Sequence, residues 1–527
     1  MRGLLWLCVL AALVDLRAFG LTDLDEGFYA SVAWAMRQSG DWLTPTFMNQ
    51  PWFEKPPLLY WLMVLSMRLF GENEFALRLP SVLFYALTIG VIVWWGNRRL
   101  GAGAGDWGAL LFAVAPLSLM LARLAITDMT LAFFLTLGVI ALWEVSAGGD
   151  TRLGRRWLWA FAGGVALGLA VLTKGPVGLA LMGLLYLWNA RALHTQGLRF
   201  RWVALALGVA LLTASPWYVG VYLQHDAEFF NEFVVKQNLL RFAGGDTAHS
   251  VLPLLQRGDW VGVVGGLAAY LLFYAVVLWL GGLPMVGYVG VLWVHGDDAL
   301  GCYLKRWAWL VFGLFTLSFT KLPAYIFPMF PVLALLAGAR IARARVAQAG
   351  NGLTAERQLR RVAPLFLASG AALWAAIALY TPLWQSAFWV IALALGMPLA
   401  VFALYKPAAP PWVRVAGILA LLIGWHGALT GYDRLALKPV RELARIPPPY
   451  RTLILYRVNP GYPSLLFYRR GQYATSGNAT ATLQQMRATG AYCLTTDAEF
   501  AHSDGVFLVA EAQAMGRRFY LTAPQHK

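Results

Sequence analysis

Acidic side chains of this chain gather in a few polar segments that separate long apolar runs. The first polar segment places Asp25 beside Glu26 in LTDLDEGFYA, and later Glu54 beside Lys55 in PWFEKPPLLYW. A short turn, RLAITDMT, contributes Asp128. Carboxylates of this kind can act as general bases toward a hydroxyl group, and they can also hold a metal ion.

Basic residues accompany these carboxylates at the ends of apolar runs. They occur in LTKGPVG (Lys174), in VVKQNLLRFAGGDTAH (Arg241) and in SFTKLPAYIFPMFP (Lys321, with Tyr325 close behind). Desolvated lysine and arginine bind phosphate oxygens strongly. Phosphate-binding cations beside a general base, at a lipid–water boundary, predict group transfer from a lipid-linked phosphate donor.

The EKPP segment holds its charged pair in a restricted backbone. A residue before proline is confined to extended conformations, so Lys55 is aimed before any ligand arrives. Each charged residue also has a simpler explanation, because a carboxylate outside a span is commonly solvated and Lys174 or Lys321 could snorkel toward headgroups. The recurrence of lysines on one face, against the usual charge bias of membrane proteins, favours a site.

The elements that position these residues are membrane helices. The chain has 527 residues, of which 59% are hydrophobic and only 13% charged, which indicates a polytopic α-helical membrane protein. Its net charge of +16 comes from short clusters between apolar runs, so it indicates contact with the lipid bilayer and not a nucleic-acid partner. The three cysteines have no metal or disulfide spacing.

The apolar runs between residues 3 and 430 predict about 13 transmembrane helices. The first run could instead be a cleaved signal peptide; we favour a retained helix. Basic clusters such as Arg98 with Arg99 mark every second loop as cytoplasmic. The outer face then receives residues 20–78, the Asp128 turn, the loop 221–258, the turn at Lys321 and the tail 431–527.

The tail differs in composition from the rest of the chain. Its short β-rich runs (TLILYR, AYCLTT, VFLVAE, RRFYLT) alternate with a polar helical stretch, ATLQQMRATG. We therefore expect two domains, a transmembrane domain at 1–430 and a small extramembrane α/β domain at 431–527.

These motifs, in this order, resemble polyprenyl-phosphate-dependent glycosyltransferases of the GT-C fold. The resemblance covers roughly residues 20–340 through LDEGFYA, PWFEKPPLLYW, NEFALRLPS, RLAITDM, LTKGPVG and TKLPAYIFPMFP. It is strongest to the branch that contains bacterial lipid A aminoarabinose transferases and the protein O-mannosyltransferases. It implies a bacterial inner-membrane enzyme whose active site and C-terminal domain are periplasmic.

The resemblance also implies roles for individual residues. The acidic site residues would be Asp25, as candidate base, with Glu26 and Asp128. Donor phosphate would contact Lys55, Arg241, Tyr325 and Lys321. Glu54 and His249 would hold a divalent metal, zinc or magnesium.

The chain departs from the aminoarabinose transferase pattern at several positions. Phe28 stands where those enzymes usually have arginine, and Gln237-Asn238 replaces a Glu-His pair. The acceptor is therefore left open among lipid A, another glycolipid or glycan, and a protein. Two further readings are an oligosaccharide ligase, which uses a larger donor, and a non-enzymatic flippase for lipid-linked sugars, which predicts functional charges in the middle of spans.

Overall fold

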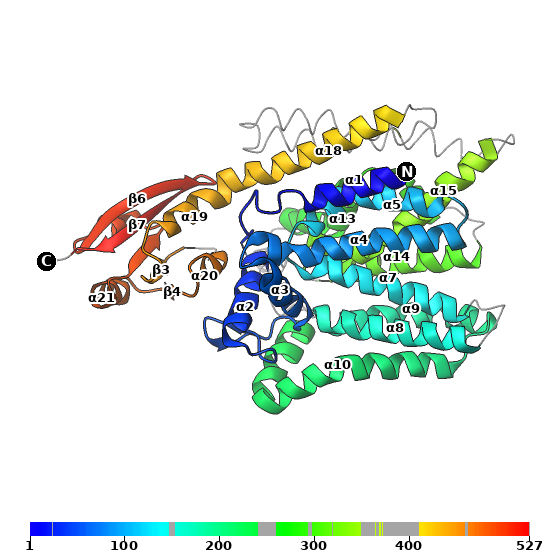
Figure 1. Cartoon of the computed structure of the whole chain (residues 1–527), viewed down its shortest axis with the longest axis horizontal. Helices are drawn as coiled ribbons and strands as arrows, with labels where there is room; N and C mark the ends of the chain where they lie inside the picture. Colours follow the sequence, from blue (N-terminus) through cyan, green and yellow to red (C-terminus); the bar gives the residue numbers. More distant parts are fainter. Residues whose placement is uncertain are drawn as a thin grey trace.

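A computed structural model describes most of the chain, namely residues 1–23, 25–146, 153–240, 260–293, 298–318, 320–348, 411–458 and 462–525, with four single positions at 364, 368, 369 and 372. Long helices form a bundle, and a small domain containing a β-sheet lies at one end of it (Figure 1). The expected fold class, a helical membrane protein with a C-terminal α/β domain, is confirmed.

The N-terminal segment builds the end of the bundle that faces the small domain. After α1 (Arg2–Leu13) come α2 (Asp25–Ser39), a short hairpin of β1 (Thr46–Phe47) and β2 (Gln50–Pro51), and α3 (Leu58–Phe70). In Figure 1, α2 and α3 stand between the long helices and the small domain. The first polar segment therefore occupies the space where the two parts of the molecule meet.

The other helical elements of the bundle follow in chain order. They are α4 (Glu74–Arg99), α5 (Ala104–Val114), α6 (Pro116–Ala122), α7 (Thr127–Ser146), α8 (Leu153–Lys174), α9 (Val177–Thr195), α10 (Phe200–Phe229), the π-helix η1 (Phe230–Leu240), α13 (Trp260–Gly281), the 3-10 segment η3 (Met285–Trp293), α14 (Ala299–Leu317), the 3-10 segment η4 (Pro323–Met329), α15 (Phe330–Gln348) and α18 (Pro411–Tyr432).

Within the described residues, six helices are long and apolar enough to cross a membrane, or up to seven if the bent pair α5–α6 forms one span. The expected total of about 13 spans stays a prediction.

Close contacts between helix backbones hold the centre of the bundle. A Cβ atom added at Gly338 of α15 would lie 2.1 Å from the carbonyl oxygen of Ala104 at the start of α5. Only glycine allows this approach, as is common where membrane helices pack through small residues. The buried core continues through Trp95, Phe112, Trp307 and Phe330.

The C-terminal domain follows α18 through the π-helical segment η6 (Asp433–Leu437). Its strands lie in the order β4-β3-β5-β7-β6, of which β4, β3 and β5 are parallel and β7 and β6 antiparallel. The strands are β3 (Leu453–Tyr456), β4 (Tyr473–Ser476), β5 (Tyr492–Thr495), β6 (Val506–Ala514) and β7 (Arg517–Pro524), and the helices are α19 (Lys438–Arg445), α20 (Ser464–Tyr468), α21 (Ala479–Thr489) and α22 (Ala498–Ala501).

The sequence predicts four of these five strands and α21. It misses β4, because the short run YATS lacks the apolar alternation that identifies a strand.

Candidate functional site

The buried phenol of Tyr29 interacts electrostatically with carboxylates from several of the predicted segments. α2 begins at the exposed Asp25, and Tyr29 follows one turn later on the buried part of the helix. Burial raises the pKa of the phenol well above its usual value, and the carboxylates of Asp25, Asp128 and Glu54 are among the groups that raise it further. Carboxylates from three separate segments therefore act on one phenol, because charge interactions fall off with distance. The ring of Tyr60 in α3 lies 5.9 Å from that of Tyr29, centroid to centroid.

A buried ion pair closes one side of this group. Asp128 stands in the first turn of α7, and its Oδ1 lies 2.5 Å from Nζ of Lys174, the last residue of α8. Both positions suit the helix dipoles, which favour an anion at a helix start and a cation at a helix end. Lys174 also interacts electrostatically with Asp25, so the pair belongs to the same site.

Tyr325 joins the site from a distant part of the chain. It lies in η4, and its ring centroid is 5.0 Å from Nζ of Lys174. This contact brings the end of α8 to η4, in agreement with the predicted meeting of helix ends. The sequence analysis names Lys174 among the cations at helix ends but gives it no role at the site; its pairing with Asp128 is what the structure adds.

Aromatic packing anchors the EKPP segment between β2 and α3. Trp52 stacks on Phe28 of α2 at 4.9 Å between ring centroids, and Phe53 meets Phe229 of α10 at 5.2 Å. Pro57 provides the N-cap of α3. The segment is thus fixed on both sides, and the charge of Glu54 acts on both Tyr29 and Tyr60.

Lys55 follows directly after Glu54 in this fixed segment. It is partly buried, and its Nζ donates to the carbonyl oxygen of Glu54 at 3.1 Å.

Lys321 has the contacts of a helix cap. Its Nζ donates to the carbonyl oxygens of Phe315 and Thr316, at 2.8 and 2.5 Å, in the last turn of α14. It also lies 3.8 Å from the ring centroid of Tyr270, and burial lowers its pKa to about 8. These contacts stabilise the end of α14. The predicted role of Lys321 in phosphate binding stays a prediction.

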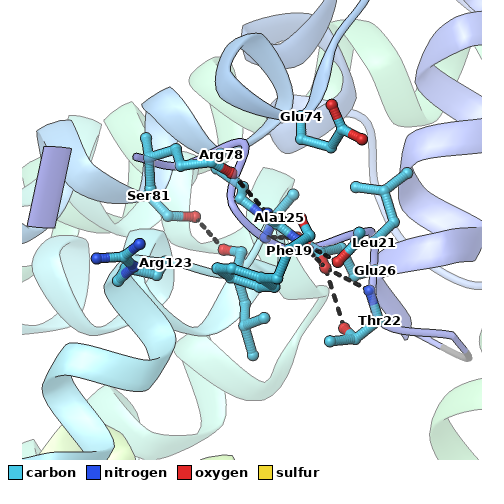
Figure 2. Close-up of polar contacts among 12 residues, drawn as sticks. Phe19, Leu21, Thr22, Glu26, Glu74, Arg78, Ser81, Arg123 and Ala125 are labelled. Atoms are coloured by element: carbon cyan, nitrogen blue, oxygen red, sulfur yellow. Dashed lines mark hydrogen bonds and ion pairs between the residues drawn. The ribbon is translucent and has the colours of Figure 1, made fainter. Parts of the chain in front are cut away.

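Glu26 is buried in a network that holds the first polar segment to the bundle (Figure 2). Its carboxylate accepts hydrogen bonds from Nε and Nη2 of Arg78 at 2.7 and 2.9 Å. The backbone N–H groups of Ala125 and Thr22 donate to it at 2.9 and 2.7 Å, and the Thr22 hydroxyl donates at 3.0 Å. A carboxylate with these contacts supports the neighbouring Asp25 from within the protein, and the predicted catalytic role of Glu26 stays a prediction.

Arg78 is the other half of this network, and the sequence analysis does not single it out. It is fully buried in α4, and its guanidinium also donates to the carbonyl oxygens of Leu16, Phe19 and Gly20 at 2.7 to 2.9 Å. The centroid of the Phe19 ring lies 3.7 Å from the guanidinium carbon of Arg78 and 5.8 Å from that of Arg123. An arginine in the apolar NEFALRLPS motif is the signal that could have identified it.

Two predicted residues, Arg241 and His249, lie outside the described residues. In the part of the chain that the structure describes, no three His, Cys, Asp or Glu side chains are placed to hold one metal ion. Of the two predicted metal ligands, only Glu54 lies in the described residues, and it offers carboxylate oxygens. Carboxylate oxygens suit magnesium better than zinc, which prefers nitrogen and sulfur ligands.

Several known proteins are similar to this chain in sequence. A family model described as dolichyl-phosphate-mannose-protein mannosyltransferase matches residues 54–219. Undecaprenyl phosphate-alpha-4-amino-4-deoxy-L-arabinose arabinosyl transferase of Pseudomonas aeruginosa is 34% identical over 354 residues, which are 65% of this chain and 60% of that protein. A corresponding enzyme of Pseudomonas fluorescens is 31% identical over 356 residues, 65% of this chain and 57% of that protein. The matched region thus spans about 60% of the length of these relatives.

Solved structures match over nearly the whole chain. The crystal structure of ArnT from Cupriavidus metallidurans in the apo state has a TM-score of 0.78 at 24% identity and covers 99% of this chain and 97% of ArnT. The ArnT crystal structure bound to undecaprenyl phosphate gives a TM-score of 0.76 with the same identity and coverage. The resemblance expected from the motifs is therefore confirmed: the chain has the fold of ArnT, and its residues 54–219 match the family model described as dolichyl-phosphate-mannose-protein mannosyltransferase.

Proposed function

We propose that this chain is an integral-membrane glycosyltransferase that moves a sugar from a polyprenyl-phosphate donor to an acceptor outside the cytoplasm. The observation that carries the proposal is the ion pair of Asp128 with Lys174 beside Tyr325, together with the charges of Asp25, Glu54 and Asp128 that act on the buried Tyr29. These residues form one polar group where several helices end. The alternative flippase predicts charges in the middle of spans, whereas these charges lie at helix ends.

The proposed reaction exchanges one bond at the anomeric carbon of the sugar. The acceptor oxygen forms a bond to that carbon, the bond from the carbon to the donor phosphate oxygen breaks, and polyprenyl phosphate leaves with the bonding electrons. Asp25 takes the proton of an acceptor hydroxyl, a contribution of about 100- to 10,000-fold. If the acceptor is itself a phosphate, Asp25 orients it. The resemblance implies inversion at the anomeric carbon.

Basic and hydroxyl groups would bind the leaving phosphate. We assign this to Lys55, Arg241 and Tyr325, with Lys321 as a further candidate, because charge-assisted hydrogen bonds to phosphate are strong in a desolvated site. The ion pair with Lys174 holds Asp128 in place. Relatives named for undecaprenyl phosphate-aminoarabinose, and an ArnT bound to undecaprenyl phosphate, support undecaprenyl phosphate as carrier.

The proposed location is the bacterial inner membrane, with the site and the C-terminal domain in the periplasm. Arg98 and Arg99 end α4, whereas the N-terminal end of α4 lies beside the C-terminal domain (Figure 1). Positive residues favour the cytoplasmic side, which assigns the opposite end to the periplasm.

A divalent metal is part of the proposal, with Glu54 and His249 as its ligands. Such an ion would neutralise charge that develops on the leaving phosphate. The test is binding of magnesium or zinc to purified protein by calorimetry, and Glu54→Gln should weaken it.

The decisive experiment uses purified protein in lipid vesicles with undecaprenyl phosphate-linked aminoarabinose and lipid A, and mass spectrometry of the products. Glycosylated lipid A with release of undecaprenyl phosphate would support the proposal for this acceptor. Movement of donor across the bilayer without transfer to lipid A or to a panel of glycolipids and proteins would support the flippase instead. Comparing lipid A, glycolipids and glycoproteins of cells with and without the protein would then identify the natural acceptor.

The phosphate role of Lys55 has its own measurement. Lys55→Ala should weaken binding of undecaprenyl phosphate by about tenfold or more, since a charged hydrogen bond contributes about 1.5–3 kcal/mol. Unchanged affinity for undecaprenyl phosphate would contradict this role.

A further inference from the structure

The C-terminal domain meets the bundle at α2, the helix that begins with Asp25 (Figure 1). The backbone N–H of Ser464, the first residue of α20, donates to Oδ1 of Asp23 at 2.9 Å. The Ser31 hydroxyl donates to the buried carbonyl oxygen of Pro463 at 2.7 Å. Both bonds are made within two helical turns of Asp25, so the domain contacts the element that carries the proposed base.

Further hydrogen bonds tie the segment before α2 to the same domain. The Tyr468 hydroxyl accepts from the backbone N–H of Leu21 and donates to Glu74 at the start of α4, both at 2.9 Å. The backbone N–H of Gly20 donates to Oδ1 of Asp433 at 2.7 Å. The small domain therefore contacts the segment on both sides of Asp25.

Position 27 shows how close this contact is. A Cβ atom added at Gly27 would lie 2.7 Å from the backbone nitrogen of Ser464, 3.0 Å from Oδ1 of Asp23 and 3.1 Å from the Pro463 ring. A backbone nitrogen cannot move aside without its helix. A side chain at this position would therefore push α20 away from α2.

The other side of the same turn is attached to the membrane helices. Glu26 binds Arg78 of α4 and the backbone of Ala125 before α7. Within four residues, Asp23 is attached to the C-terminal domain, Asp25 faces outward, and Glu26 is attached to the bundle. Asp25 therefore stands between two fixed neighbours that belong to different parts of the molecule.

We infer that the C-terminal domain forms part of the transfer site and that Asp23, through Ser464, is a positioning residue for Asp25. The inference rests on the proposed function, in which Asp25 accepts the acceptor proton. Displacement of a catalytic group by 1 Å costs about 100-fold in rate. Loss of the contacts between α2 and the C-terminal domain should therefore lower turnover and leave donor binding at Lys55 and Tyr325 unchanged.

Gly27→Ala is the main test, because it displaces α20 without removing any polar group. We expect turnover of sugar transfer to fall about 10- to 100-fold, with affinity for undecaprenyl phosphate within about twofold of wild type. Amide hydrogen exchange in α2 and α20 should become faster. Gly90→Ala is the matched control, since a Cβ atom at that helical position meets open space; it should leave all three measurements unchanged.

A pair of substitutions at Asp23 tests the hydrogen bond itself. Asp23→Ala removes the acceptor and should lower turnover by a similar factor, whereas Asp23→Asn keeps an acceptor oxygen and should restore turnover to within about threefold of wild type. Asp23→Leu separates the hydrogen bond from side-chain volume, because leucine is at least as large as aspartate but has no acceptor oxygen; turnover in this variant should stay as low as in Asp23→Ala.

The outcomes separate this inference from the proposed function. Wild-type turnover in Gly27→Ala, in a protein whose α20 exchanges faster, would overturn the inference and leave the transferase assignment intact. A parallel loss of donor affinity would also overturn it, since it would show a general collapse of the site. Absence of transfer by the wild-type protein with every donor and acceptor tried would overturn the proposed function and the inference together.

Discussion

Asp25 is the only one of the three converging carboxylates with an exposed side chain. Asp128 is buried in its ion pair, and Glu54 is partly buried in the anchored EKPP segment. An acceptor approaching from the water side would therefore meet Asp25 first. This exposure supports its assignment as the base over its two acidic neighbours.

Asp25→Asn should lower turnover by about 100- to 10,000-fold, because an amide cannot accept the acceptor proton. The free energy of unfolding should stay near the wild-type value, since the side chain is exposed. Steady-state transfer and thermal unfolding measure the two effects. Asp41→Asn, at an acidic position in the same polar segment, serves as control. Wild-type turnover in Asp25→Asn would remove the base assignment.

We expect the ion pair of Asp128 with Lys174 to affect both the free energy of unfolding and the transfer activity. Lys174→Gln should destabilise the protein by about 3–5 kcal/mol, because it leaves a buried charge without its partner. The double variant Asp128→Asn, Lys174→Gln should recover much of that stability but not transfer activity. Thermal unfolding and transfer assays on the four proteins form the cycle. Recovery of activity in the neutral double variant would show that the charges serve folding alone.

At the scale of elements, the contact between Glu26 and Arg78 attaches the first turn of α2 to α4. Arg78 binds three carbonyl oxygens of the segment after α1 as well as Glu26, so one side chain joins α4 to the approach of α2. Buried ion pairs are often no more stable than apolar replacements of both partners, but the loss of one partner is costly. The network thus specifies a geometry more than it adds stability.

Arg78→Met should lower the free energy of unfolding by about 3–5 kcal/mol, because Glu26 would remain charged and buried. The control is Arg191→Met, at an exposed arginine of α9, which should change the same quantity by less than about 0.5 kcal/mol. Thermal unfolding in detergent measures both. Equal stability of the two variants would contradict the positional role of Arg78.

At the scale of the whole molecule, the contact between the small domain and the bundle contains a carboxyl group that titrates near neutrality. Burial raises the pKa of Asp23 to about 7; the charge of Glu26 raises it, and the Ser464 hydrogen bond and Arg441 lower it. The charge of Asp23 also acts on the hydroxyl groups of Tyr432, Tyr462 and Tyr473.

The sign of the pH effect follows from the raised pKa. Between the ordinary value of 3.8 and about 7, the folded protein binds more protons at Asp23 than the unfolded chain does. The contribution of this group to stability is therefore fully present below about pH 4 and is lost as the pH rises through 7.

Hydrogen exchange in α20 should accordingly become faster between pH 6 and pH 8, after correction for the intrinsic pH dependence of exchange. Asp23→Asn cannot titrate, so the corrected rates of that variant should stay level over the same range. The same slope in both proteins would show that another group controls the contact.

The sequence alone determined the features that depend on local composition. Hydropathy predicts the membrane class, alternation predicts four strands of the C-terminal domain, and the motifs around Asp25, Lys55 and Asp128 predict the family and its acidic site. These signals need only neighbouring residues, because hydrophobic periodicity and turn chemistry act over one element at a time.

Only the tertiary structure decided which charges meet. Arg78 lies 52 residues from Glu26, Lys174 lies 46 from Asp128, and Ser464 lies 441 from Asp23. A buried charge takes its partner from whichever helix end is nearest in space, and desolvation makes that pairing obligatory. Such a choice depends on how the helices pack, which no local pattern contains. For this reason the sequence named Asp128 and Lys174 separately but not their pairing, and it did not point to Arg78 or to the contact of the C-terminal domain with α2.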